Sequence, residues 1–134
     1  MSNRADGNRF ERELCVALSV NGFWVHNFAQ NAAGQPADVI AVKDGKAYLI
    51  DCKVCKNDVF LFSRIEYNQE LAMRKWREAH NGSGWFALEL SDGLVYMLHQ
   101  SDFTSDYKQL NREEIERYCK PLTEWVQEVN KLWS

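Results

Sequence analysis

Two aspartates and a lysine occupy a stretch of sequence that otherwise has the composition of a buried sheet. Asp38 precedes the apolar run VIAV, Asp51 follows the run AYLI, and Lys53 comes two residues after Asp51. The pair Asp44-Gly45 between the runs predicts a tight β-hairpin. Each aspartate is then equally far from the turn, so the two carboxylates are expected nearly opposite one another. Because strand side chains alternate between faces, Asp51 and Lys53 share one face.

Two neighbouring carboxylates repel each other unless a cation lies between them. A site rich in carboxylates and poor in histidine suits Mg²⁺, for which Mn²⁺ can substitute, and the carbonyl of Cys52 is a further candidate ligand. Such an ion activates a water and stabilises charge on a phosphate. Lys53 would steer that water or stabilise the pentacoordinate phosphate. The pattern therefore predicts metal-dependent phosphodiester hydrolysis.

The structural alternative for Asp51 and Lys53 is a salt bridge on an edge strand. The acid-x-lysine pattern also occurs at Asp44 and at Asp106, but in a turn and a polar loop, where charge is solvated. Only Asp51-Cys52-Lys53 interrupts an apolar strand, where charge is costly to bury without a partner. The surroundings of the triplet, and not the triplet itself, favour a functional site.

Hydrophobic periodicity and turn residues predict the elements that must position these side chains. The order α-β-β-β-α-β-β-α-α indicates one α/β or α+β domain. A capping-box pattern, Ser63-Arg64-Ile65-Glu66, is expected to start the second helix. The predicted ranges are a helix at 7–21, a strand at 23–26, a loop at 27–36, strands at 38–43 and 47–54, a helix at about 63–80, strands at 84–90 and 94–99, and helices at 111–119 and 123–133.

Composition limits the classes of function. A chain of 134 residues with 46% hydrophobic and 26% charged residues is typical of one globular domain. The net charge of −3 counts against a generic nucleic-acid binder, but residues 81–134 carry nine acidic and five basic side chains. A basic face in the first half is therefore allowed. The polar N-terminus and the absence of a long apolar run predict a cytoplasmic protein without a membrane segment.

The cysteines do not predict a disulfide framework or a zinc site. Cys52 and Cys55 have CxxC spacing, but the other two cysteines stand alone, and no histidines stand at zinc-ligand spacing to complete a site. In a strand these two thiols also point to opposite faces. Free thiols in a reducing cytoplasm are the expectation.

The segment Pro36-Ala37-Asp38 together with Asp51-Cys52-Lys53 resembles the PD-(D/E)XK nuclease superfamily. Two further segments narrow the resemblance. GNRFEREL at 7–14 is similar to the opening helix of archaeal Holliday junction resolvases, and VFLFSRIEYNQ at 59–69 is similar to a segment of bacterial RecU-type resolvases. The resemblance covers about residues 5–98.

The resemblance implies an α/β fold with a restriction-endonuclease-like core, in which a central mixed sheet is flanked by helices, plus two C-terminal helices. We expect a single nuclease domain over 1–134, with its core at about 5–100 and a helical extension at about 108–134. The resemblance also implies that Glu11 is a third carboxylate of the metal site and that Gln69 lies beside it.

The implied function is a Mg²⁺-dependent DNA endonuclease that resolves four-way junctions, with Glu11, Asp38, Asp51, Lys53 and Gln69 at the site. Symmetrical cutting needs two sites and so a homodimer. Two alternatives stay open: a nuclease of the same core acting on flaps, nicks or duplex, and a non-catalytic nucleic-acid or protein-binding module. The candidate phosphate contacts are Arg9, Arg12, Lys56 and Arg64.

Overall fold

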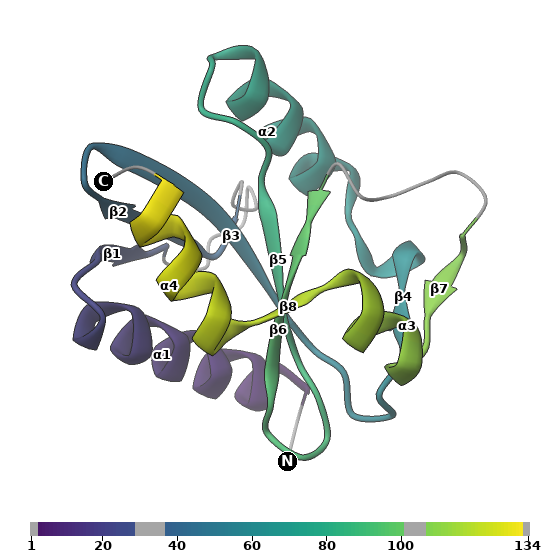
Figure 1. Ribbon diagram of the computed structural model, residues 1–134. Coiled ribbons are helices and arrows are strands. Elements are labelled where there is room, and N and C mark those ends of the chain that lie inside the picture. Colours follow the sequence, from purple (N-terminus) through teal and green to yellow (C-terminus); the bar gives the residue numbers. More distant parts are fainter. Residues whose placement is uncertain (1–2, 29–36, 101–106, 133–134) are drawn as a thin grey trace.

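The computed structural model describes residues 3–28, 37–100 and 107–132 of the chain (Figure 1). The loop predicted at 27–36, including Pro36, lies almost entirely outside these residues. In chain order the elements are α1 (Asn3–Val20), β1 (Trp24–Asn27), β2 (Val39–Lys43), β3 (Lys46–Val54), β4 (Phe60–Leu61), the 3₁₀ helix η1 (Phe62–Arg64), α2 (Tyr67–Glu78), β5 (Trp85–Glu89), β6 (Val95–His99), β7 (Gln109–Leu110), α3 (Arg112–Tyr118), β8 (Lys120–Pro121) and α4 (Leu122–Leu132).

A mixed sheet forms the centre of the protein. Within the described residues it has six strands in the order β1-β2-β3-β5-β6-β8. β3 and β5 are parallel, and the other neighbours are antiparallel. β4 and β7 pair separately as a two-stranded sheet. The predicted α/β fold, a central mixed sheet flanked by helices, is confirmed.

The hairpin between β2 and β3 has the predicted turn. Lys43 pairs with Lys46, and the two residues between them have positive φ angles, 52° at Asp44 and 78° at Gly45. Two successive positive φ angles are typical of a type I′ turn, which Asp-Gly favours. The resulting register pairs Val39 with Ile50. Asp38 and Asp51 are the next residues outward, so the predicted opposition of the two aspartates is confirmed.

Helices cover both faces of the sheet (Figure 1). α1 and α4 pack on one face, where the buried ring of Trp125 lies against Phe23, Tyr48 and Trp85. The other face is covered by α2, α3 and the small β4–β7 sheet, through Met73, Ile115, Phe60 and Leu110 among others. Both C-terminal helices therefore contribute to the core.

Three local predictions were wrong. α2 begins at Tyr67 with Glu66 at the N-cap, one turn later than the predicted box, and residues Phe62–Arg64 form a 3₁₀ turn. The short strands β4, β7 and β8 were not predicted. The five tryptophans fall at apolar positions of the predicted helices and strands, which favours a place in the core. Trp24 is instead 64% exposed, because β1 is an edge strand. Among the described residues, none of the helices has the length and apolar character needed to span a membrane.

Candidate active site

The candidate site lies where β2 and β3 separate. β2 starts at Val39, opposite Ile50, whereas β3 continues to Val54 and pairs there with β5 on its other side. The carboxylate of Asp38 takes the place of a strand partner on the opened edge: its Oδ2 accepts a hydrogen bond of 2.7 Å from the Cys52 N–H. The Asp38 N–H in turn donates to the Ile50 carbonyl. These two hydrogen bonds, one to the carboxylate and one from the backbone N–H, fix Asp38 against β3.

Asp51 is completely buried. It contacts the side chains of Lys53 and Gln69, which also contact each other. Its Oδ2 lies 3.1 Å from Nζ of Lys53. Its Oδ1 accepts a 3.1 Å hydrogen bond from Nε2 of Gln69, and Oε1 of Gln69 accepts one of 3.2 Å from Lys53. Each member therefore contacts the other two, which fixes the direction of the lysine side chain.

Gln69 reaches this position because it belongs to the first turn of α2. Its Oε1 also accepts a 3.1 Å hydrogen bond from the Glu66 N–H, one of the orphan donors at the helix start. The same side chain thus caps α2 and contacts Asp51 and Lys53. The shift of the helix start from Ser63 to Glu66 is what places Gln69 in the first turn.

The carboxylates of Glu11, Asp38 and Asp51 interact electrostatically near the point where β2 and β3 separate. Burial raises the pKa of Glu11, on α1, to about 7, and the Asp38 carboxylate contributes to the rise. Burial also raises the pKa of Asp51 well above its usual range, again with a contribution from Asp38, while Lys53 acts in the opposite direction. Asp38 is therefore close enough to influence both of the other acids.

The chemistry of this donor set fits a hard divalent cation. Oδ2 of Asp51 is buried and accepts no hydrogen bond, although it contacts the Lys53 ammonium. The N–H and C=O groups of one residue point to the same side of a strand. The Cys52 carbonyl therefore points to the side on which the Cys52 N–H donates to Asp38. In the described ranges, no three His, Cys, Asp or Glu side chains are already grouped to hold a metal. The carboxylates that fit such an ion are Glu11, Asp38 and Asp51.

The four predicted phosphate contacts differ in their surroundings. Arg12 is exposed on α1. Arg9 forms ion pairs with Glu13 and with the buried Glu89 of β5, so its guanidinium ties α1 to the sheet. Its role in DNA binding stays a prediction, and no sequence signal links it to Glu89, eighty residues away.

Lys56 and Arg64 lie nearer the site. Lys56 follows β3 and forms a 2.6 Å ion pair with Asp6 of α1. Arg64 donates from Nη1 to the Val54 carbonyl at the end of β3. Both side chains are exposed, and both line the same groove beside Lys53.

The raised pKa values predict that the metal-free protein loses stability as pH rises. Glu11 and Asp51 hold protons in the folded state that the unfolded chain has already released. The contribution of Glu11 therefore decreases from about pH 4 towards about pH 7, and Asp51 acts in the same direction. We expect a lower melting temperature in EDTA at pH 7.5 than at pH 5.5, and a smaller difference in Glu11→Gln. A melting temperature that is flat or rises over this range would contradict the assignment.

Substitution of Gln69 should impair the site more than the fold. In Gln69→Ala, Asp51 loses a hydrogen bond and Lys53 loses one of its two partners. We therefore expect the turnover of the phosphodiester hydrolysis that the sequence predicts to fall by roughly 10- to 100-fold. Asn68→Ala, which removes the neighbouring exposed amide, serves as the control. Metal-free DNA affinity should be unchanged in both variants. A loss of affinity that accounts for the whole effect would rule out a positioning role.

Comparison with known proteins identifies the family of the chain. Residues 2–126 match the protein family described as archaeal Holliday junction resolvase (Hjc). The match runs through α3 into α4, beyond the segment that carries the motif resemblance. No curated protein matches the chain.

Solved structures share the fold. The Hjc Holliday junction resolvase of the hyperthermophilic archaeon Archaeoglobus fulgidus superimposes with a TM-score of 0.71. The alignment covers 90% of this chain and 99% of that chain, at 18% sequence identity. The likeness at this identity supports the fold.

Proposed function

The chain belongs to the archaeal Holliday junction resolvase family, and from that premise we propose that it is a Mg²⁺-dependent endonuclease that cuts four-way DNA junctions. Its active site would lie where β2 and β3 separate. The family assignment makes it a junction-resolving nuclease. The roles of individual residues, the choice of Mg²⁺ and the homodimer are proposals. The observation that supports the residue roles and the metal is the arrangement of Asp51, Lys53 and Gln69 beside Asp38.

The carboxylates would hold the metal. Resolvases of this family generally use a divalent metal ion, which activates a water and neutralises charge on the scissile phosphate when it is bound. Asp38, directly before β2, and Asp51, in β3, would supply ligands, with Glu11 contributing from α1 and the Cys52 carbonyl from β3. Burial, and after it the Asp38 carboxylate, raises the pKa of Glu11 and of Asp51, and a bound cation would favour the charged form of both. Mn²⁺ has similar ligand preferences and should substitute.

Lys53 would act on the reacting phosphate. Its ammonium is held between Asp51 and Gln69, and its side chain is 11% exposed. A cation held at this depth is screened little by solvent, so it stabilises negative charge on the phosphate more strongly than a surface lysine does. Because two partners fix its direction, little reorganisation is needed when the substrate binds. Gln69 would keep both Asp51 and Lys53 in place without contacting the DNA.

A homodimer follows from the reaction and not from a contact in the structure. A four-way junction is resolved by two cuts on strands of like polarity. One chain provides one site, so paired cutting requires two copies related by a two-fold axis. Gel filtration with light scattering tests this directly, and a strictly monomeric mass with and without junction DNA would contradict it.

Cleavage of a substrate panel by the wild-type protein tests the preferred DNA structure. Labelled four-way junction, duplex, flap and single-stranded DNA are incubated side by side with Mg²⁺ or with EDTA. We expect paired symmetrical nicks on the junction in Mg²⁺ only. Equal cutting of flaps or duplex would keep the nuclease and overturn the junction preference. Metal-independent cutting would overturn the metal site.

A further inference from the structure

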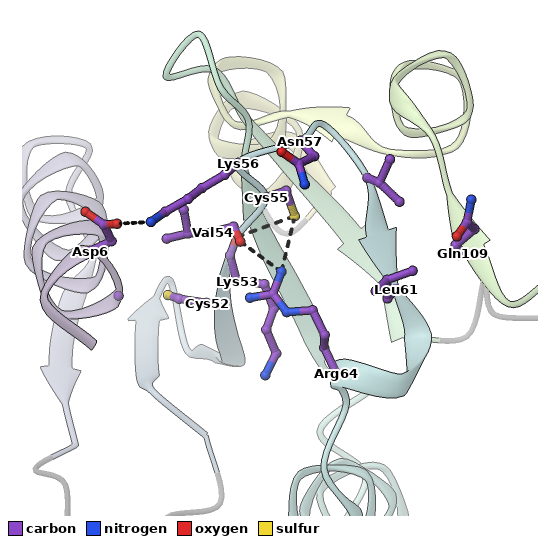
Figure 2. Close-up of a pocket in the computed structure, with 12 residues that line it drawn as sticks. Asp6, Cys52, Lys53, Val54, Cys55, Lys56, Asn57, Leu61, Arg64 and Gln109 are labelled. Atoms are coloured by element: carbon purple, nitrogen blue, oxygen red, sulfur yellow. Dashed lines mark hydrogen bonds and ion pairs between the residues drawn. The ribbon is translucent and has the colours of Figure 1, made fainter. Parts of the chain in front are cut away.

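A groove of about 610 Å³ leads away from Lys53 along the end of β3 (Figure 2). Its volume falls within the range of roughly 300 to 1,000 Å³ that is typical of ligand sites. Figure 2 shows α1 with Asp6 on one side, Leu61 and Gln109 on the other, and Val54 and Cys55 between them. The groove is therefore continuous with the candidate active site.

The charge of the groove differs from that of the whole protein. The net charge of the chain is −3, but the charged residues lining the groove are Lys53, Lys56, Arg64 and Asp6. Three cations against one carboxylate give a local excess of positive charge. Such an excess attracts a phosphodiester backbone without reading its bases.

A glycine in α1 keeps this groove open. Gly7 lines the groove, and a Cβ added there would meet no atom within 4 Å. Glycine destabilises a helix interior, and its φ here is not one that requires glycine. Gly7 lies four residues before Glu11, on the same helical face and about 6 Å further along the axis. The missing side chain therefore leaves space directly beside the active site.

We propose that this groove binds the DNA strand immediately next to the scissile phosphate, with Lys56 and Arg64 contacting the adjacent backbone phosphate and Gly7 giving room for the sugar. This proposal rests on the proposed function, because it assumes that the substrate is DNA cut at Lys53. Both α1 and β3 extend from the active site into the groove, so one DNA strand follows them without a turn. The apolar side chains of Val54 and Leu61 suit the deoxyribose.

Asp6 would compete with the phosphate for Lys56. The carboxylate lies 2.6 Å from Nζ, and the hydrogen bond from Lys56 lowers the pKa of Asp6, so it stays charged at neutral pH. A bound phosphate would take over the ammonium and meet the carboxylate as a like charge. Asp6 therefore weakens DNA binding, and its ion pair with Lys56 is replaced when the strand enters.

Neutral phosphates placed one at a time around the cut site test the assignment. Junction DNA carrying a single methylphosphonate is titrated with wild-type protein and with Lys56→Ala in EDTA, so that binding is measured without cleavage. We expect one position next to the scissile phosphate at which the neutral group weakens wild-type binding, on the order of tenfold. Lys56→Ala should bind unmodified DNA more weakly than wild type does and be less sensitive to that same substitution, because Arg64 is then its one remaining contact among the two proposed.

Lys120, on the edge strand β8, supplies a matched control for Lys56. Lys120 is also an exposed lysine in an ion pair with a carboxylate, Glu128. Lys120→Ala should retain wild-type affinity and its sensitivity to the methylphosphonate. Asp6→Asn should tighten DNA binding by a few-fold, whereas Glu128→Gln should leave it unchanged.

Gly7→Leu tests whether the space beside Gly7 is needed for DNA binding, without changing the charge of the groove. Because leucine favours a helix and meets no clash at Cβ, the variant should melt at a higher temperature than wild type and yet bind DNA more weakly. Equal sensitivity of wild type and Lys56→Ala at every flanking position, with normal cleavage, would overturn the groove and leave the nuclease intact. Failure of the wild-type protein to bind or cut any DNA would overturn both.

Discussion

Lys53→Ala is expected to abolish most cleavage while leaving DNA binding nearly intact. The ammonium is held by Asp51 and Gln69 in a nearly buried position, where its effect on the reacting phosphate is large. Removal of one such preorganised group typically lowers turnover by about 10²- to 10³-fold. The measurement is the single-turnover rate of junction cleavage at saturating protein and Mg²⁺, which separates chemistry from binding.

Lys120→Ala provides a control for this substitution, since it also removes an ion-paired lysine, but from the edge strand β8, where the side chain is 49% exposed. Its cleavage rate should match that of wild type. If Lys53→Ala instead cuts within about threefold of wild type at saturation, Lys53 has no part in the chemistry. The contact with Asp51 would then be only a structural ion pair.

Asp51→Asn should lose turnover without losing stability in metal-free protein. The carboxylate is fully buried with its pKa raised well above the usual range, first by burial and then by Asp38, so keeping it charged at neutral pH is unfavourable. An amide of the same shape removes that cost, although it gives up the contact with Lys53. We expect an equal or higher melting temperature at pH 7.5 in EDTA, and no detectable junction cleavage in Mg²⁺.

Asp58→Asn is the matched comparison, because the same change is expected to have the opposite sign there. Asp58 accepts hydrogen bonds from the backbone N–H and the hydroxyl of Ser91 and pairs with Arg112. The hydrogen bond from the Ser91 backbone is the largest cause that lowers its pKa. The asparagine variant should melt at a lower temperature and cut normally. A clear loss of stability in Asp51→Asn would show that its ion pair serves the fold.

The parts of the site that depend on local sequence were predictable. Asp44-Gly45 fixes a two-residue turn, and the turn fixes the register that places Asp38 opposite Asp51. Strand alternation then places Lys53 on the face of Asp51. Each of these steps involves neighbours in the chain or across one hairpin.

The parts that depend on distant contacts were not predictable from the chain alone. Both Ser63 and Glu66 are plausible starts for α2, and the hydrogen bonds of Gln69 to Asp51 and Lys53 are made only from the later start. The pairing of Arg9 with Glu89 has no local pattern, so Arg9 was considered only as a phosphate contact. The proposed role of Gly7 depends on the groove, which three segments far apart in the sequence enclose.

Iron-directed cleavage of the polypeptide tests the metal site most directly. Fe²⁺ replaces Mg²⁺ in the junction-bound protein, and hydroxyl radicals generated with ascorbate and peroxide cut the chain near the ion. The proposed site predicts cuts close to Glu11, Asp38 and Asp51, suppressed by excess Mg²⁺ and absent in Asp51→Asn. Cuts confined to another region, such as the acidic residues around Asp58 and Asp92, or a pattern unchanged in Asp51→Asn, would contradict it.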